Sequence, residues 1–402
     1  MSTSPTQPAP RLVSLDAYRG FIMLLMASGG LGFASMVMRL EQAGEPVSPL
    51  LRFLGFQTDH VAWIGCSFWD LIQPSFMFMV GVAMPYSIAS RAARGDGFWK
   101  RLLGACWRAV LLVLLAVFLS SPQPLPQGAT TGPTTQWIFP NVLAQIGLGY
   151  AFVYLLAGRG LVVQVVAMVA VLVGYTLYFG LYPLSSPPPE WQKMEPNWVP
   201  MEGWFAHWNK NSNAAHFFDV WFLNLFPTVQ PFTFNAGGYQ TLNFVPSMAT
   251  TILGLIAGEK LRSAGSNEHK LVWLLLMSAG CLALGMAMGE WVCPIVKPIW
   301  TPSWAVYSAG WTFLMLAMFF AVIEIVGWKA WAFPFVVVGM NSIAMYCMSQ
   351  QLRGWVRGNL TTHLGSGTFT GEYGNLIESV AILGVLWLIC LWMYRKRIFL
   401  RL

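Results

Sequence analysis

Residues Phe68–Ser90 read FWDLIQPSFMFMVGVAMPYSIAS, an apolar run that contains no lysine or arginine. A run of this length can cross the ~30 Å hydrocarbon core of a bilayer as an α-helix, which Pro74 and Pro85 should kink. Its one carboxylate, Asp70, needs a partner inside the protein, because an ionised side chain is costly within a membrane. The run therefore predicts a transmembrane helix that carries a structural or catalytic carboxylate near one end.

Similar apolar runs recur along the whole chain. Of its 402 residues 56% are hydrophobic and only 10% are charged, a balance that excludes an ordinary soluble domain. We predict an all-α polytopic membrane protein with about ten transmembrane helices in one domain, residues 1–402, after a short disordered tail, residues 1–10. The spans are expected near Phe21–Val37, Phe68–Ser90, Ala105–Leu119, Val142–Leu156, Leu161–Leu181, Val245–Ala257, Leu271–Trp291, Trp304–Val326, Phe333–Gln351 and Ile377–Tyr394.

The basic residues indicate an orientation. The net charge of +7 is scattered over interhelical segments and forms no stripe, so we expect no nucleic-acid partner. If the N-terminus is cytoplasmic, 16 of the 23 Lys and Arg fall inside, as the positive-inside rule requires of a protein with both termini inside. The residues expected outside are Arg39, Arg52, Lys193, Lys210, Lys297, Arg353 and Arg357. The expected location is an inner (plasma) membrane, with the lipid bilayer as partner.

A long outer segment, residues 182–244, is expected to be functional, because it is too long for a simple connector and too aromatic for a disordered one. Two interpretations of its tryptophans stay open. They form an interfacial belt at headgroup depth, or they form a lid that stacks on a sugar ring. The tryptophans concerned are Trp191, Trp198, Trp204, Trp208 and Trp221.

Polar residues inside or beside the spans are the candidate site residues. His60 lies at the mouth of the second span, and its ordinary pKa near neutrality suits a general base; the alternative is an interfacial hydrogen-bonding role. Asp70 lies inside that span and is predicted as a second catalytic residue or as a structural partner. The candidate substrate-binding residues are Trp63, Gln145, Lys297 and Asn341.

A group of arginines is expected on the cytoplasmic side. Their guanidinium groups could hold phosphates, although a positive-inside loop would have the same composition. The candidate cofactor-binding residues are Arg19, Arg91, Arg94, Arg101 and Arg108. No zinc spacing, phosphate-binding loop or dinucleotide fingerprint occurs in the sequence, so we expect no metal.

Several motifs in fixed order carry a family resemblance. They are Ser14–Gly20 (SLDAYRG), His60–Gly65 (HVAWIG), Asp70–Gly81 (DLIQPSFMFMVG), Asn141–Gly147 (NVLAQIG), Pro294–Ser303 (PIVKPIWTPS) and Phe335–Tyr346 (FVVVGMNSIAMY). Together they span nearly the whole chain and resemble the heparan-alpha-glucosaminide N-acetyltransferases and their bacterial relatives of unassigned function.

The resemblance implies a transmembrane acyltransferase that takes an acetyl group from cytoplasmic acetyl-CoA and transfers it to an amino sugar or glycan outside. It also implies that His60, in the His-x-x-Trp-x-Gly motif, is the catalytic histidine. Two departures concern the acceptor. Asn235–Gly238 replaces the family's Asp-Pro-Glu-Gly, and the asparagine expected late in the first helix falls on Ala27 or Ser28.

The main alternative is a transporter or flippase of a small polar or lipid-linked solute, which would also need polar residues within the membrane. A structural subunit would explain Asp70 and Lys297 poorly. Acyl transfer requires a base for the acceptor and donors for the oxyanion. Direct transfer and transfer through an acetylated His60 both stay open, as does a homo-oligomeric assembly.

Overall fold

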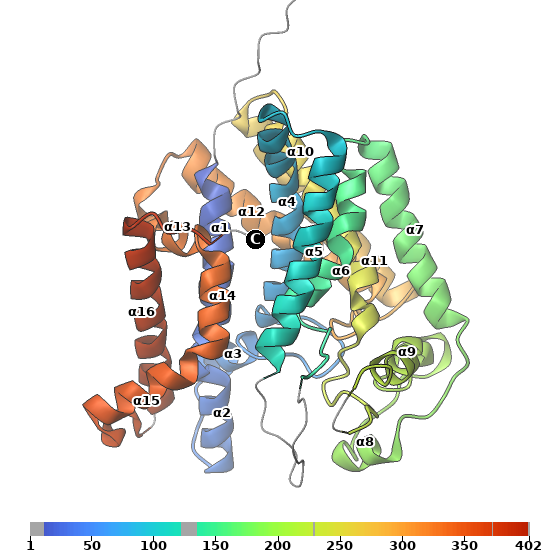
Figure 1. Ribbon diagram of the computed structural model, residues 1–402. Coiled ribbons are helices and arrows are strands. Elements are labelled where there is room, and N and C mark those ends of the chain that lie inside the picture. Colours follow the sequence, from blue (N-terminus) through green and yellow to red (C-terminus); the bar gives the residue numbers. More distant parts are fainter. Residues whose placement is uncertain (1–11, 122–134, 228–229, 372, 401–402) are drawn as a thin grey trace, which may run out of the picture. The chain divides into compact units, whose positions relative to one another are not determined.

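The computed structural model describes residues 12–121, 135–227, 230–371 and 373–400, which Figure 1 colours from blue to red along the chain. These residues are helical and contain no β-strand, which confirms the all-α prediction. The predicted tail, residues 1–10, lies outside the described residues. The chain divides into two compact units, and each is described by itself: a central unit, Met77–Thr312, and a terminal unit formed by Leu12–Phe76 and Phe313–Leu402.

All ten predicted apolar runs are helical. Within the described residues, eight helical stretches are long and apolar enough to cross a membrane: Val13–Gln42, Trp69–Ala93, Phe98–Ser120, Leu161–Gly180, Thr241–Arg262, Asn267–Trp291, Pro302–Ile325 and Gly374–Arg395. The run predicted at Phe333–Gln351 is a pair of helices bent by 69°, and it makes a ninth span if the pair counts as one. The remaining run, Val142–Leu156, has the predicted bounds but only 15 residues, about 22 Å of helix.

The central unit holds most of α4 and α12, whose ends belong to the terminal unit. Its helices are α4 (Ile72–Ala93), α5 (Phe98–Ser120), α6 (Val142–Leu156), α7 (Leu161–Gly180), α8 (Pro189–Met194), α9 (Ala214–Leu223), α10 (Phe244–Arg262), α11 (Asn267–Trp291) and α12 (Pro302–Phe320). Helix α10 packs against α6 and α7. It also meets α4 backbone to backbone, since a Cβ on Gly254 would lie 2.0 Å from the Phe78 carbonyl oxygen.

The segment between α7 and α10 folds into short helices, and α8 and α9 lie together at the lower end of α7 in Figure 1. The 3₁₀ turns η3 (Gly203–Trp208) and η4 (Thr241–Asn243) complete it. Trp191 and Trp208 are fully buried, whereas Trp204 and Trp221 are exposed. Two tryptophans therefore form the core of this segment, a role that neither the belt nor the lid interpretation includes.

The terminal unit contains the other helices: α1 (Val13–Ser28), η1 (Gly29–Gly32), α2 (Phe33–Gln42), α3 (Pro49–Gln57), η2 (Trp69–Leu71), η5 (Ala321–Ile325, a π-helix), η6 (Ala330–Ala332), α13 (Phe333–Gly339), α14 (Ser342–Gln351), α15 (Arg353–Leu364), η7 (Ser366–Phe369) and α16 (Gly374–Arg395). Helix α1 packs closely on α13, because a Cβ on Gly20 would lie 1.7 Å from the Phe335 carbonyl oxygen. The buried Tyr18 hydroxyl lies 3.0 Å from the Ser75 hydroxyl near the start of α4. The first motif of the sequence therefore fixes α1 against α13 and against the part of α4 that belongs to the terminal unit.

Candidate functional site

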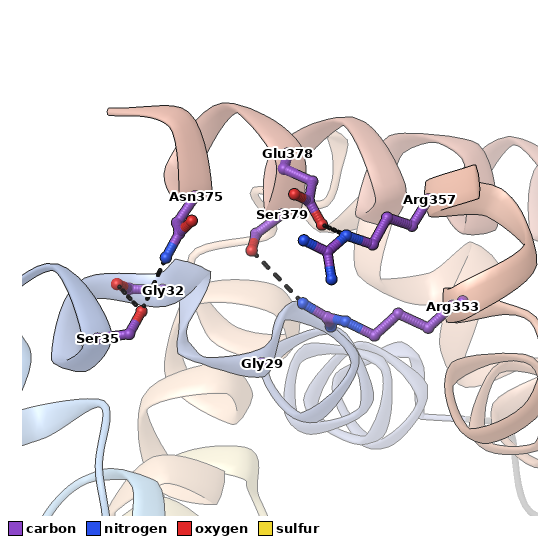
Figure 2. Close-up of a pocket in the computed structure, with 9 residues that line it drawn as sticks. Gly29, Gly32, Ser35, Arg353, Arg357, Asn375, Glu378 and Ser379 are labelled. Carbon is purple, nitrogen blue, oxygen red and sulfur yellow. Dashed lines mark hydrogen bonds and ion pairs between the residues drawn. The ribbon is translucent and has the colours of Figure 1, made fainter. Parts of the chain in front are cut away.

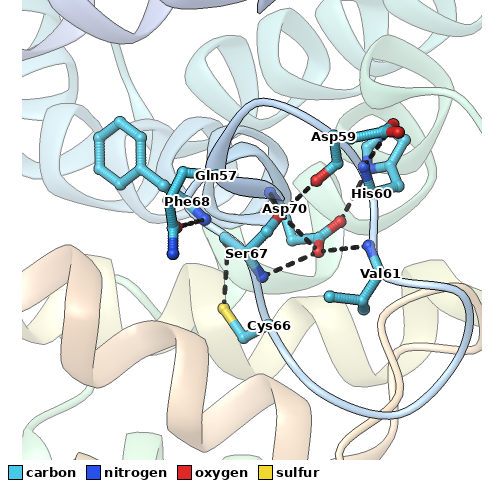
Figure 3. A network of polar contacts seen from close by, with 8 residues as sticks. All are labelled: Gln57, Asp59, His60, Val61, Cys66, Ser67, Phe68 and Asp70. Atoms are coloured by element: carbon cyan, nitrogen blue, oxygen red, sulfur yellow. Dashed lines mark hydrogen bonds and ion pairs between the residues drawn. The ribbon is translucent and has the colours of Figure 1, made fainter. Parts of the chain in front are cut away.

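A histidine and an aspartate, both predicted as catalytic, meet in the terminal unit. Figure 3 shows His60 on the segment between α3 and η2, with Asp70 at the entrance of α4. The Nδ1 atom of His60 lies 2.7 Å from Oδ1 of Asp70. The His60 side chain is 46% exposed, whereas the Asp70 side chain is 1% exposed. A buried carboxylate therefore holds one edge of a ring that solvent and small molecules can reach.

The loop before α4 surrounds the second oxygen of Asp70 with donors (Figure 3). The backbone N–H groups of Ser67 and Val61 donate to Oδ2 at 3.1 and 3.3 Å, and the Ser67 hydroxyl lies 3.0 Å away. The Phe68 N–H donates to the side-chain oxygen of Gln57 at 2.8 Å, which ties the loop to α3. Charge-assisted bonds of this kind stabilise a buried carboxylate and fix its orientation.

This geometry selects one form of the His60 ring. When Asp70 is ionised, its oxygens only accept hydrogen bonds, so Nδ1 then carries the hydrogen and the neutral ring has its lone pair on Nε2. The same logic operates in hydrolase triads, where an aspartate fixes the tautomer and stabilises the imidazolium that forms. The pair can therefore take up a proton at Nε2 and release it again.

Two of the predicted substrate-binding residues lie in the terminal unit and are buried. Trp63 is 3% exposed, so its ring is covered by protein. Asn341, between α13 and α14, uses both ends of its amide on the C-terminal segment. Its Nδ2 donates to the Ile398 carbonyl at 3.0 Å, and its Oδ1 accepts from the Leu400 N–H at 3.2 Å. Asn341 therefore anchors the chain end.

The other two predicted substrate-binding residues, Gln145 and Lys297, lie in the central unit. Hydrogen bonds to η4 connect the segments that carry them. Gln145, at the start of α6, donates from Nε2 to the Thr241 carbonyl at 3.2 Å. Asn243 donates to the carbonyl of Pro298, the residue after Lys297. Gln145 and Lys297 are 1% and 4% exposed. The structure thus connects two distant sequence motifs through one buried polar region.

Helix α9 adds two ionisable residues to this region that the sequence analysis did not single out. Asp219 accepts the Thr241 N–H at 2.8 Å, and burial raises its pKa to about 7. Burial lowers the pKa of His216 to about 4. Both lie in the apolar helix Ala214–Leu223, so the signal used for Asp70, a polar residue in an apolar run, would have found them.

Three of the four predicted cofactor arginines of the central unit gather where α4 ends and α5 begins. The positive charges of Arg101, Arg91 and Arg108 all interact with the hydroxyl of Tyr154 on α6. Arg108 donates to the Tyr150 hydroxyl at 2.8 Å and stacks over its ring. This group forms a positive surface next to two tyrosines.

Part of that charge is already neutralised inside the protein. Asp96 contacts Arg91 at 3.2 Å and Lys100 at 2.6 Å, and these two hydrogen bonds, first that of Lys100, hold the Asp96 pKa below its usual range. Arg94 is exposed. Among the predicted phosphate-binding arginines of the central unit, Arg101 and Arg108 therefore remain the strongest candidates.

A cavity of about 380 Å³ lies in the central unit where α4, α6 and α10 end, and Arg262 lines it with Glu259. Arg262 donates to the Pro85 carbonyl at 2.8 Å. Arg262 is not among the predicted site residues. Arg19, the fifth predicted cofactor residue, lies in the terminal unit with its guanidinium 3.8 Å from Asp16. Among the described residues, no cluster of three His, Cys, Asp or Glu side chains could hold a metal ion.

The fold and the His60–Asp70 pair define a multi-pass helical membrane protein with a candidate proton-transfer site. Residues 11–186 match a family described as a domain of unknown function, DUF5009. The chain is 23% identical over 377 residues to human heparan-alpha-glucosaminide N-acetyltransferase, and 23% identical over 443 residues to the mouse protein of that name. These matches cover 84% and 97% of this chain but 52% and 60% of the relatives, so the chain spans little more than half of their length. They confirm the resemblance that the motifs predict.

Proposed function

We propose that the chain is a membrane acetyltransferase that moves an acetyl group from cytoplasmic acetyl-CoA to an extracytoplasmic amino sugar or glycan. The observation that carries the proposal is the contact between His60 and the buried Asp70. The resemblance of the chain to named N-acetyltransferases supports the same class of reaction. The proposed location is a bacterial inner membrane, with N- and C-termini inside.

In the proposed reaction the acceptor amine attacks the thioester carbonyl of acetyl-CoA. A C–N bond forms, the C–S bond breaks, and CoA leaves as a thiolate that takes up a proton. His60 accepts the amine proton at Nε2, and Asp70 stabilises the resulting imidazolium through Nδ1–H. Direct transfer needs one such proton step, which is why we favour it over an acetylated His60.

The donor would bind through its phosphates to the arginine group of the central unit, above all Arg101 and Arg108. Arginine forks match phosphate geometry and stay charged at any physiological pH. We expect CoA at a hundred times its Kd to stabilise the purified protein by about 2.7 kcal/mol. Arg108→Gln should reduce this stabilisation, measured as a Tm shift, whereas Arg159→Gln, an exposed arginine on a different loop, should not. A Tm unmoved by millimolar CoA would contradict the donor site.

The transporter alternative makes a different prediction in detergent, where no gradient exists. An acetyltransferase given acetyl-CoA and glucosamine should release one CoA thiol for each acetylated sugar, followed with a thiol reagent and by mass spectrometry. A carrier leaves both compounds chemically unchanged. Absence of CoA release across a panel of amino sugars, while the protein stays folded and binds CoA, would exclude the enzyme in favour of the carrier.

A further inference from the structure

The terminal unit contains a polar cavity of about 400 Å³ that the proposed reaction does not use (Figure 2). It is bounded by the break after α1 and by the first turns of α15 and α16. The lining residues are Gly29, Gly32, Ser35, Arg353, Gly354, Arg357, Asn375, Glu378 and Ser379.

One wall is made of unusual backbone. Residues Gly29, Gly30, Leu31 and Gly32 all have positive φ angles, of 61°, 68°, 54° and 76°. Leucine adopts this left-handed conformation only at a cost, so the surrounding packing must hold it there. A Cβ on Gly29 would lie 2.9 Å from Nη1 of Arg353. The glycines thus end α1 and let the guanidinium lie against the backbone.

Arg353 is held in place but keeps donors to spare. Its Nη1 donates to the Ala27 carbonyl at 3.0 Å, and its Nη2 lies 3.4 Å from the Ser379 hydroxyl. A guanidinium has five N–H donors, so more than half are not used by the described residues. Its described partners are neutral, so its positive charge is not paired with a carboxylate there. A fixed, charged donor of this kind suits a bound oxyanion.

The second arginine of the cavity is paired and more exposed. Nε of Arg357 lies 2.8 Å from Oε1 of Glu378, and their side chains are 65% and 16% exposed. Two arginines and one glutamate leave the cavity with a net positive charge. The N-terminus of α16, which begins at Gly374, adds a partial positive charge beside Asn375. The cavity therefore favours an anion over a neutral sugar.

We propose that this cavity binds a single oxyanion group, the phosphate of a lipid headgroup or of a small soluble anion. The site does not depend on the acetyl-transfer proposal, since His60, Asp70 and the arginines near α5 take no part in it.

The test uses the full-length protein in detergent, washed free of lipid, with inorganic phosphate as probe and sodium chloride at matched ionic strength as reference. Phosphate should raise the Tm, and Arg353→Gln should weaken the apparent affinity about 10–100-fold, the loss expected for a charged hydrogen bond. Arg353→Lys should recover little, because lysine lacks the fork. Glu378→Gln should strengthen phosphate binding, because it releases Arg357 and removes a negative charge.

The matched control is Arg52→Gln. Arg52 is 64% exposed and lies 3.4 Å from Glu41, as Arg357 pairs with Glu378, but it lies outside the cavity. If Arg52→Gln reduced phosphate binding as much as Arg357→Gln, the effect would be one of general charge and the site would be disproved. Arg357→Gln should weaken phosphate binding, because it removes a positive charge from the cavity, whereas Glu378→Gln should strengthen it. These opposite effects decide the question even if Arg353→Gln does not fold.

A second arm separates the two sources of phosphate. The protein is placed in nanodiscs of phosphatidylcholine with or without phosphatidylglycerol, and lipid retained after release is counted by native mass spectrometry. One phosphatidylglycerol retained by the parent and lost in Arg357→Gln identifies the ligand as a lipid. Phosphate binding without lipid retention identifies a soluble anion. No response to phosphate and no retained lipid would overturn the proposal.

Discussion

We expect the Asp70 carboxylate to contribute to catalysis by orienting the His60 ring. Asp70→Asn keeps the size of the side chain but can present its amide N–H to Nδ1, which would favour the wrong tautomer of His60. We expect turnover, measured as CoA release per folded molecule, to fall about 10²–10⁴-fold. Asp59→Asn is the control, because the Asp59 side chain accepts the backbone N–H of His60, at 2.8 Å, and its backbone carbonyl, which the substitution keeps, accepts the Ser67 hydroxyl. This variant should stay near parental activity. Near-parental turnover of Asp70→Asn would leave Asp70 a purely structural role.

At the scale of single residues, the sequence predicts which residues belong to the candidate site, but not the contacts between them. His60 and Asp70 were found from one motif and one polar residue in an apolar run. Their contact depends on how the loop between α3 and η2 turns, which local pattern does not encode. Asn341 was selected by the same polar signal, but the chain end occupies its amide. A polar side chain within the membrane needs a hydrogen-bond partner, and that partner can be a backbone group instead of a substrate.

Helix α9 should respond to pH in two opposing ways. The Asp219 pKa is raised from 3.8 to about 7, so its contribution to stability is lost as pH rises through this range. The His216 pKa is lowered from 6.5 to about 4, so its contribution is lost as pH falls from 6.5 to 4. The Tm of Asp219→Asn relative to the parent should therefore increase with pH, and that of His216→Gln should decrease. Flat differences for both variants would contradict the burial of this helix.

The contact between α4 and α10 is a second feature at the scale of elements. A Cβ on Gly254 would lie 2.0 Å from the Phe78 carbonyl oxygen, so Gly254→Val must push the helices apart. We expect a loss of at least 1–3 kcal/mol, seen as a lower Tm in detergent. Gly280→Ala on α11 is the control, because no atom lies within 4 Å of its added Cβ. It should be neutral or stabilising by up to about 1 kcal/mol. Equal effects of the two changes would contradict the close α4–α10 packing.

The sequence predicted the helices far better than their breaks. Apolar runs located all ten helical regions, since only satisfied backbone can lie in hydrocarbon. The turn of left-handed residues at Gly29–Gly32 and the 69° bend between α13 and α14 were missed. Both depend on close backbone packing, which hydropathy does not measure. The cavity at Arg353 was missed for the same reason, because it forms only where α1 breaks.

The whole molecule is expected to act across the membrane, with the acetyl donor on one side and the acceptor on the other. Composition and the distribution of Lys and Arg predict this orientation. The motif order predicted the family resemblance that the human and mouse relatives confirm. What sequence could not predict is the acceptor.

The most direct test is vectorial transfer in sealed proteoliposomes that contain glucosamine inside and receive radiolabelled acetyl-CoA outside. Molecules with their cytoplasmic face outward should place labelled N-acetylglucosamine in the lumen while CoA appears outside. His60→Ala should lower this signal by about 10²–10⁴-fold at unchanged Tm and unchanged CoA binding. Label that enters the lumen still attached to CoA, or a His60→Ala protein that acetylates as fast as the parent, would contradict a His60-dependent membrane acetyltransferase.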